Sequence, residues 1–398
     1  MITSVRVEPD TTVAHHAAVG AHPWLPVVAS IVGAVAIGIG LAHDPVRTWS
    51  NLLVDGFCVL SLALGGMVFI AVHHLSDAAW SAGIRRVAEA MMCALPIAAP
   101  MMLALFFGRG SLYTWAVGAP AAEHEMVSTI SWYFTVPFIF TRMAVFLTTW
   151  MLFAVLMRRT SARADSSADL IHHQRMVRYS AAFIGIFALS FSLATVDWLL
   201  SLDPRWTSTI FAVYVCSGLL VEGVAAITLA VVVLHERGHL ADVVNENHLH
   251  DLGKLLFAFT TFWAYIWVSQ YLLIWYGNLP EETSHYAIRT DPSWVTAFLA
   301  NPIVNWLIPF VVLLPRASKR RPSVLKWVAV VLLLGRWLDV YLLVAPQTMK
   351  APAFGLLELS IAFAYGGLTW HVVAGALARR PLVVQHDPYL YDCRRHHQ

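Results

Sequence analysis

The chain has 398 residues, of which 58% are hydrophobic and 13% are charged, and its formal net charge at pH 7 is +2. A soluble globular protein carries about 25% charged residues, so this composition excludes a soluble globule and indicates a polytopic membrane protein. The near-zero net charge also argues against a nucleic-acid partner.

Polar and histidine-rich residues fill positions 1–23, before the first long apolar run. They lack the pattern of a secretory signal peptide, in which a basic segment precedes a short apolar core and a small-residue cleavage site. We therefore expect the first span to insert uncleaved, with residues 1–23 forming an N-terminal tail. Residues 379–398 are again polar and are expected to form a C-terminal tail.

Ten apolar runs are long enough to cross a membrane, because a helix rises about 1.5 Å per residue and the hydrocarbon core is roughly 30 Å thick. The expected spans are 24–42, 50–72, 87–107, 132–157, 179–202, 209–234, 252–276, 295–314, 324–344 and 355–378. The sequence thus predicts an all-α integral membrane domain over residues 24–378.

Lys and Arg are distributed unequally between the two sides of the expected membrane domain. Most lie in the loops on the side of the N-terminus, in segments 85–86, 158–178, 316–326 and 379–395. The opposite loops hold only Arg47, Arg109, Arg205, Arg289 and Lys350. Because positively charged loops stay in the cytoplasm, both termini are expected to be cytoplasmic.

Two parts of the chain share a pattern of residues. Asp197 precedes Pro204 at the end of the fifth span, and Asp339 precedes Pro346 at the same interval at the end of the ninth. The second and sixth spans each carry a Cys eight residues after a Ser, at Cys58 and Cys216. Four spans separate the copies, an even number, so both insert in the same direction. We expect two four-helix bundles, about 50–202 (spans two to five) and 209–344 (spans six to nine), with spans one and ten outside.

Ionisable side chains within the spans are the strongest functional lead, because each costs about 2.5 to 3.5 kcal/mol at the bilayer centre. Counting along each span places Arg142, Glu222 and Arg336 near mid-depth. A ladder of such groups would let protons cross the membrane. The candidates for this proton path are Asp55, Glu89, Arg142, Asp197, Glu222, His250, Asp251, Lys254, Arg336, Asp339, Glu358 and His371.

The alternative to a proton path is a set of ion pairs that lock the helices together. Arg336 and Asp339 are one helical turn apart on the same span and are placed to pair. Arg142 would then pair with either Glu222 or Asp197. In that case the charges serve stability alone.

The sequence shows no pattern that would hold a redox centre or a metal. The cysteines are isolated, at Cys58, Cys93, Cys216 and Cys393, with no CxxC pair. His371 is the single histidine well inside an expected span, so two axial ligands for a haem are lacking. His248 and His250, two residues apart on a helix, point to different faces. We therefore expect this chain to bind no metal and no cofactor.

A quinone site needs a slot with aromatic walls and an acid or amide that takes the hydroxyl proton. Asp55, Gln270 and Tyr276 are expected near the periplasmic surface and supply these residue types. The alternative is that Tyr276 and the tryptophans near it belong to the aromatic belt of the membrane interface.

Residues 251–282, DLGKLLFAFTTFWAYIWVSQYLLIWYGNLPEE, combine a span with many hydrogen-bonding side chains. Further motifs are SNLLVDGF at 50–57, VDWLLSLDPRWTSTIF at 196–211, GRWLDVYLLVAP at 335–346 and HDPYL at 386–390. With these motifs the chain closely resembles the NrfD-like, or polysulfide-reductase-like, membrane subunits of alternative complex III. The likeness is greatest to the second of the two such subunits in that complex.

The resemblance implies a subunit of a quinol-oxidising respiratory complex in the bacterial inner membrane, with the same two-bundle plan. Quinol would be the substrate of the complex and its oxidation would be associated with the other NrfD-like subunit. Iron–sulfur clusters and haem c would lie in partner subunits. The partners it implies are the second NrfD-like membrane subunit, a periplasmic iron–sulfur protein, a multihaem cytochrome c, other small membrane subunits and a terminal oxidase.

The expected role of this chain is that of a scaffold and proton-conducting module without a redox centre of its own. The competing hypothesis is an autonomous secondary transporter or ion channel. Broken helices favour it, and the prolines that would break them are Pro96, Pro100, Pro137, Pro302 and Pro309.

Overall fold

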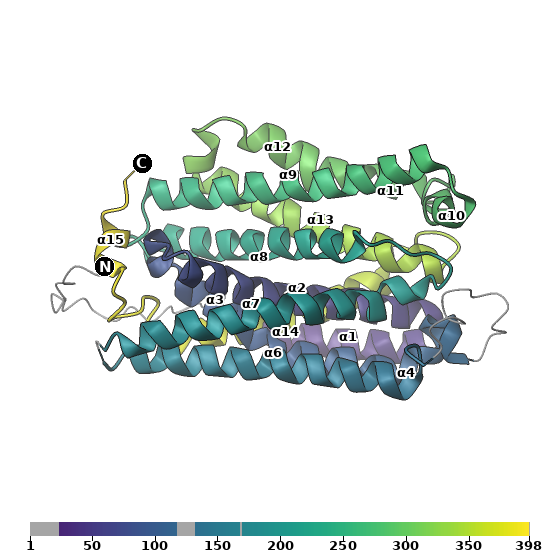
Figure 1. Cartoon of the computed structure of the whole chain (residues 1–398), viewed down its shortest axis with the longest axis horizontal. Helices are drawn as coiled ribbons and strands as arrows, with labels where there is room; N and C mark the ends of the chain where they lie inside the picture. Colours follow the sequence, from purple (N-terminus) through teal and green to yellow (C-terminus); the bar gives the residue numbers. More distant parts are fainter. Residues whose placement is uncertain (1–23, 118–131, 168, 398) are drawn as a thin grey trace.

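The computed structural model describes residues 24–117, 132–167 and 169–397. Every regular element in these ranges is a helix, and ten of the helices are long and apolar enough to cross a membrane. Figure 1 shows the long helices side by side along the long axis, with α10 at one end and α15 at the other. The prediction of an all-α protein with ten spans is confirmed at this level, and the chain is a multi-pass membrane protein.

The helices that form these spans follow the predicted ranges closely. They are α1 (Trp24–His43), α2 (Pro45–Leu75), α3 (Arg85–Met91) continued by α4 (Leu95–Leu112), α6 (Val136–Ala164), α7 (Ile171–Trp198), α8 (Phe211–Glu236), α9 (Glu246–Gly277), α11 (Val295–Pro302) continued by α12 (Ile308–Leu313), α13 (Pro322–Thr348) and α14 (Leu356–Ala378). The short helices α10 (Pro280–Arg289) and α15 (Leu390–Arg394) lie outside them.

Helix ends are set by local chemistry rather than by hydropathy. The Asp44 side chain accepts a hydrogen bond from the Arg47 backbone N–H at 3.2 Å, and Pro45 occupies the first turn of α2. Asn245 caps α9 in the same way. Such side chains satisfy backbone donors that the first turn of a helix leaves unpaired. Helix α7 begins at Ile171, eight residues before the predicted start of the span at residue 179. Its first turns are polar and precede the apolar run from which the span was predicted.

Two of the spans are broken, whereas Pro137, also predicted to break a helix, lies in the first turn of the continuous helix α6. A short 3₁₀ turn, Met92–Ala94, separates α3 from α4. A π-helical turn, Ile303–Leu307, follows Pro302 and separates α11 from α12. A π turn shifts the hydrogen-bond register and frees backbone and side-chain polar groups for other contacts.

Most of the other spans pack directly against α2, which is the most buried of the ten. Helix α2 packs against α4 and α7 on one side, and α7 packs against α6. On the other side it packs against α8 and α13, and α8 packs against α9. Helices α2 and α8 cross where Gly65 meets Gly223, and a Cβ on Gly65 would lie 2.7 Å from the Gly223 Cα atom. Glycine on both sides therefore permits this close crossing.

Helices α1 and α14 form a pair at the side of this arrangement. They pack against each other, and α14 also packs against α2 and α3. Helix α1 is the least buried span. The arrangement of two bundles with the first and last spans outside them stays a prediction.

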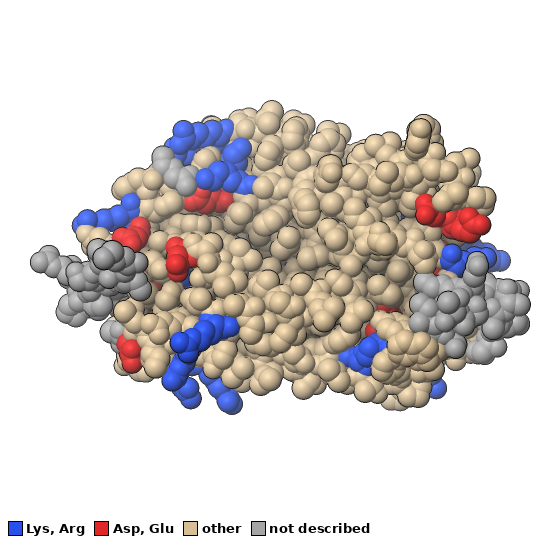
Figure 2. Space-filling view, in the orientation of Figure 1, with Lys and Arg blue, Asp and Glu red and all other residues tan. Residues whose placement is uncertain are grey.

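Charged side chains gather at the two ends of the molecule. Figure 2 shows them near the α15 end and near the α10 end, with a broad uncharged band between. A band of this kind fits the hydrocarbon layer of a bilayer. We call the two ends the α15 end and the α10 end.

The C-terminal segment packs against the α15 end. Asp387 forms an ion pair with Arg85, and the His396 side chain lies 2.6 Å from the Asp251 carboxylate. The Cys393 thiol is buried and donates to the backbone oxygen of Trp80 at 3.1 Å. Burial raises the pKa of this thiol to about 11, so it stays protonated at neutral pH.

Candidate functional site

Asp339 on α13 is the meeting point of polar side chains from four helical segments. Its Oδ1 atom accepts hydrogen bonds from the Tyr214 hydroxyl on α8 and from the Asn301 amide on α11, the latter at 2.7 Å. Its Oδ2 atom accepts from Arg336 and from the Trp263 indole on α9, the latter at 3.3 Å. A carboxylate that accepts this many bonds is well matched to a buried site.

Arg336 is fully buried and pairs with Asp339 one turn away, as predicted. Gly218 on α8 provides the space for it, because a Cβ at Gly218 would lie 2.2 Å from the Arg336 Cζ atom. The Nε and Nη2 atoms of Arg336 have no hydrogen-bond partner within the described ranges. A buried guanidinium with unused donors favours nearby water or a second anion.

Glu222 supplies that second anion at the same level of the protein. It lies one turn beyond Gly218 on α8, is 4% exposed, and interacts electrostatically with Arg336. Its Oε2 atom has no hydrogen-bond partner among the residues that the structure describes. Glu222, Arg336 and Asp339 therefore form one buried ionic network, in which Glu222 is the less constrained acid.

Arg142 belongs to a different cluster. Its guanidinium donates two hydrogen bonds to the Asp197 carboxylate, at 2.9 and 2.8 Å, and lies over the rings of Tyr133 and Phe138. Of the two partners considered for it, Asp197 is therefore correct and Glu222 is wrong. Arg142 lies in the second turn of α6 and Asp197 in the last turn of α7, so Arg142 is nearer the α10 end than its predicted mid-depth.

A buried group of residues under α10 continues the Asp339 network outward. The His285 ring stacks on Trp206 with 3.7 Å between centroids, and its Nδ1 atom lies 3.9 Å from the Asp203 carboxylate. Arg289, one turn along α10, donates to the Leu342 backbone oxygen at 3.1 Å. The i, i+4 spacing puts His285 and Arg289 on the inner face of α10.

The electrostatics of this group follow from burial and from Arg289. The pKa of His285 is lowered to about 3, because burial and the nearby Arg289 charge both disfavour its protonated form. Burial also lowers the pKa of Arg289 to about 10. Burial alone would raise the pKa of Asp203, but the His285 contact and the charges of Arg205 and Arg289 lower it overall. At neutral pH we therefore take His285 as neutral and Asp203 as ionised.

A cavity of about 20 Å³ connects these two groups of residues. Its lining includes Tyr214 and Asp339 on one side and Gln270, His285 and Arg289 on the other. About 10–15 Å³ is enough to hold one water molecule with several polar partners. The cavity thus allows a water-mediated contact between the Asp339 network and the α10 end.

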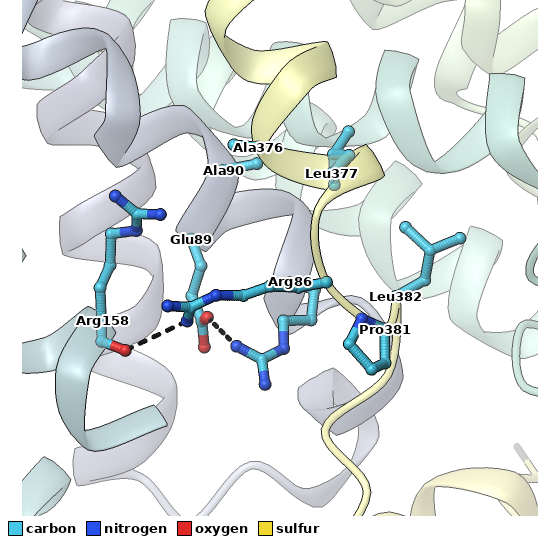
Figure 3. Close-up of a pocket in the computed structure, with 9 residues that line it drawn as sticks. Arg86, Glu89, Ala90, Arg158, Ala376, Leu377, Pro381 and Leu382 are labelled. Carbon is cyan, nitrogen blue, oxygen red and sulfur yellow. Dashed lines mark hydrogen bonds and ion pairs between the residues drawn. The ribbon is translucent and has the colours of Figure 1, made fainter. Parts of the chain in front are cut away.

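The predicted candidates at the α15 end form separate ion pairs. Figure 3 shows Arg86 turned toward Glu89, and the distance between the paired atoms is 2.6 Å. Asp251 pairs with Lys254 at 2.5 Å and with the C-terminal His396. His250 is buried beside them on α9.

The other predicted candidates are spread over α2 and α14. Glu358, at the first turn of α14, pairs with Arg47 at 2.7 Å. Asp55 accepts a hydrogen bond from the Trp337 indole at 2.7 Å. His371 is exposed on α14. The twelve candidates therefore do not form one continuous ladder in the residues that the structure describes.

The three residues predicted for a quinone site do not share a cavity. Asp55 lines a groove beside α14, whereas Gln270 lines the small cavity under α10 and donates to Ser208 at 3.1 Å. Tyr276 is 85% exposed at the end of α9. The structure thus places Asp55 and Gln270 at different cavities, and a quinone site formed by the three residues stays a prediction.

The residues under α10 were missed by the sequence reasoning. His285, Arg289 and Asp203 lie between spans, where polar residues are ordinarily solvated. The signal that was present is the i, i+4 spacing of His285 and Arg289 in a short helix that begins with Pro280.

The fold and the network define a multi-pass helical membrane protein with a buried ionic network open toward one end. No family model matches the chain, and no curated protein matches it. The likeness to the NrfD-like subunits therefore rests on the sequence motifs alone. Within the described ranges, no group of three or more His, Cys, Asp or Glu residues is placed to hold a metal ion.

Proposed function

We propose that the chain conducts protons across the membrane as a subunit of a quinol-oxidising respiratory complex. The observation that supports proton conduction is the line of polar groups from Glu222 through Arg336 and Asp339 to the cavity under α10. Ionisable residues inside a membrane protein are expensive and commonly mark a proton or ion path.

Each group has a distinct task in this proposal. Glu222 takes up and releases the proton, because its Oε2 atom is free of other bonds in the described structure. Arg336 stays charged and stabilises whichever carboxylate is ionised, since a guanidinium does not lose its proton in proteins. The proton then passes from Asp339 through the water-sized cavity to the α10 end, next to His285. Water supplies the route on the α15 side.

The sequence resemblance supports the proposed complex, its partners and its location. We propose that the α15 end faces the bacterial cytoplasm and the α10 end faces the periplasm. The partners would be a second NrfD-like subunit, a periplasmic iron–sulfur protein and a multihaem cytochrome c, together with small membrane subunits and a terminal oxidase. We also propose that two helix groups, α2–α7 and α8–α13, are copies of one four-helix unit.

The second candidate function is an autonomous secondary transporter or ion channel. It is favoured by the π turn at Ile303–Leu307, because transporters often bind ions where a spanning helix is interrupted. Asn305 in this turn bonds the Gly335 backbone oxygen at 2.9 Å, next to Arg336. Isolation of a stable single-chain protein that moves a solute would favour this function over a complex subunit.

The experiment that tests proton conduction compares two Glu→Gln variants on the same helix. The purified complex is placed in liposomes, and quinol turnover and proton movement are recorded together. We expect Glu222→Gln to slow coupled proton movement by about tenfold or more while assembly is kept. Glu236→Gln is the matched control, because Glu236 lies at the exposed end of α8, paired with Lys326. Equal proton movement in both variants would refute the proposed path.

A further inference from the structure

A basic pocket lies at the α15 end, where α3 and the ends of α6 and α14 line one small cavity. Figure 3 shows Arg86 and Glu89 of α3 with Arg158 of α6 on one side and the segment after α14 on the other. Arg380, just after α14, donates from its guanidinium to the Arg158 backbone oxygen at 3.3 Å. The cavity has about 10 Å³, which is enough for one water molecule or for one oxygen atom of a larger group.

The carboxylates at this pocket are already paired. One oxygen of Glu89 lies 2.6 Å from Arg86, and the other accepts from the Ser161 hydroxyl at 2.5 Å. Asp165, at the end of α6, pairs with the same Arg86. One arginine thus serves both acids.

The other arginines of the pocket have no such partner. Within the described ranges, neither Arg158 nor Arg379 nor Arg380 forms an ion pair with a carboxylate. All three interact electrostatically with the Cys93 thiol in the turn between α3 and α4, so their charges act on one small region. Like charges that gather in this way repel one another, and an anion placed among them removes the repulsion. The cluster therefore favours an anionic ligand.

Arg86 gives a second, independent indication of a ligand. It is 4% exposed, and its Nη1 and Nη2 atoms donate to Glu89, Ser161 and Asp165. Its Nε atom, however, has no hydrogen-bond partner in the part of the chain that the structure describes. A buried donor is ordinarily satisfied by an acceptor. Because Arg86 lines the cavity, an oxygen atom held there can accept from it.

The position of the pocket selects a lipid over a free ion. Arg158 lies in the last two turns of α6, and Arg379 directly follows α14, so both lie at the border of the apolar band. On the membrane side of Arg158, Leu152 and Val155 are 55% and 43% exposed. The cavity is too small to enclose a whole phosphate ion, but it admits one oxygen of a phosphate whose substituents extend into the membrane. Basic pockets between spanning helices are typical sites for anionic lipid head groups.

We propose that this pocket binds the phosphate group of an anionic phospholipid such as phosphatidylglycerol. The phosphate lies among Arg158, Arg379 and Arg380, and one of its oxygens enters the cavity and accepts from the Arg86 Nε atom. The acyl chains lie along the exposed apolar side of α6. A zwitterionic head group fits less well, because its ammonium group lies among the same arginines while Glu89 is already paired.

This lipid joins the ends of α6 and α14, which belong to different parts of the helix arrangement. The proposal goes beyond the proposed function and does not depend on proton conduction. It rests on the arginines without acid partners, on the buried Nε atom of Arg86 and on the place of the pocket at the membrane border.

Two neighbouring arginines on α6 provide a matched test. Arg158 lines the pocket, whereas Arg159 is exposed and does not line it. The full-length protein is purified in a non-ionic detergent, stripped of lipid and titrated with phosphatidylglycerol or phosphatidylcholine, and bound lipid is counted by native mass spectrometry. We expect phosphatidylglycerol to bind about tenfold more tightly than phosphatidylcholine.

The variants should separate a specific contact from a general positive field. Arg158→Gln and Arg380→Gln should each weaken phosphatidylglycerol binding by about tenfold, because each removes a charged donor. Arg159→Gln should change it by less than about twofold, because an exposed charge away from the phosphate is screened. Thermal unfolding without lipid checks that each variant is folded. Equal affinity for the two lipids, or equal losses in Arg158→Gln and Arg159→Gln, would overturn the proposal.

Two further measurements do not require a variant. Inorganic phosphate at the concentration of the lipid should not displace phosphatidylglycerol, and displacement would show a site for the free ion instead of a lipid. A phosphatidylglycerol with a photoreactive head group should label α3, the end of α6 or segment 376–382, and label confined to other segments would place the lipid elsewhere. Proton movement does not enter these readouts, so the lipid site and the proposed function can fail separately.

Discussion

Asp197 and Asp339 each lie seven residues before a proline near the end of a spanning helix, yet their arginine partners occupy different positions relative to them. Asp197 on α7 receives Arg142 from the neighbouring helix α6, and Asp339 on α13 receives Arg336 from its own helix. The first arrangement ties two helices together. The second leaves the arginine free to face Glu222 on α8, which makes Asp339 and not Asp197 part of a network.

The Arg142–Asp197 pair should therefore act as a structural lock. Arg142→Gln leaves the fully buried Asp197 carboxylate without its partner, which should cost about 3 to 5 kcal/mol of stability. The double variant Arg142→Gln with Asp197→Asn should recover a large part of this loss. Thermal unfolding in detergent measures both changes.

Lys326→Gln is the control for the lock. It breaks an ion pair with Glu236 in which both side chains are more than one-third exposed, so its effect should stay below about 1 kcal/mol. If Arg142→Gln is no more harmful than Lys326→Gln, the lock assignment is wrong.

Packing of α10 should weaken in acid because of His285. Its pKa is about 3 in the folded chain against an ordinary value of 6.5. Between these values the released helix binds a proton that the packed helix does not. The packing therefore loses stability as pH falls from 6.5, by at most about 1.4 kcal/mol per pH unit.

Hydrogen exchange of α10 amides at pH 7 and pH 5 measures this loss. We expect faster opening at pH 5 after correction for the intrinsic exchange rate. His285→Phe keeps an aromatic ring against Trp206 but cannot titrate, so the pH dependence should vanish. An unchanged pH dependence in this variant would show that another group controls the packing.

The sequence predicted those features that depend on a long apolar run or on spacing within one helix. The ten spans and the Arg336–Asp339 pair are of this kind, and so is the break at Pro302. Contacts between helices were harder to predict from the sequence, because hydropathy does not reveal which helix faces meet. Arg142 accordingly had two candidate partners before the structure separated them.

The missed part of the network has a similar cause. A histidine between two spans is ordinarily solvated, and only the fold shows that α10 turns His285 inward against Trp206. The predicted quinone residues illustrate a related limit of sequence. Asp55, Gln270 and Tyr276 suited the chemistry, but Asp55 lies on α2 beside the groove of α14, whereas Gln270 on α9 lines the small cavity under α10 and Tyr276 is exposed at the end of α9.

The space beside Gly218 should be essential for the network. Gly218→Ala would place a methyl group 2.2 Å from the Arg336 Cζ atom and push the guanidinium away from Asp339. Overpacking of this kind costs about 1 to 3 kcal/mol. We also expect reduced proton movement in the reconstituted complex.

Gly185→Ala is the matched control for Gly218→Ala. Gly185 lies within α7, and an added Cβ there meets no atom within 4 Å. Alanine is favoured over glycine in a helix by about 1 kcal/mol, so this variant should be neutral or more stable. Equal stability and activity of the two variants would show that Arg336 has room to move.

The orientation of the chain can be tested by cysteine labelling in intact cells. The α15 end carries Arg158, Arg163 and most other basic residues, so it should face the cytoplasm. A cysteine at Ser166, which is exposed at that end, should then resist a membrane-impermeant thiol reagent. A cysteine at Thr290, exposed at the α10 end, should react. Labelling is read as the increase over the parent chain, and both sites should react after the cells are permeabilised. Reaction at Ser166 and protection at Thr290 in intact cells would reverse the orientation and, with it, the direction of the proposed proton path.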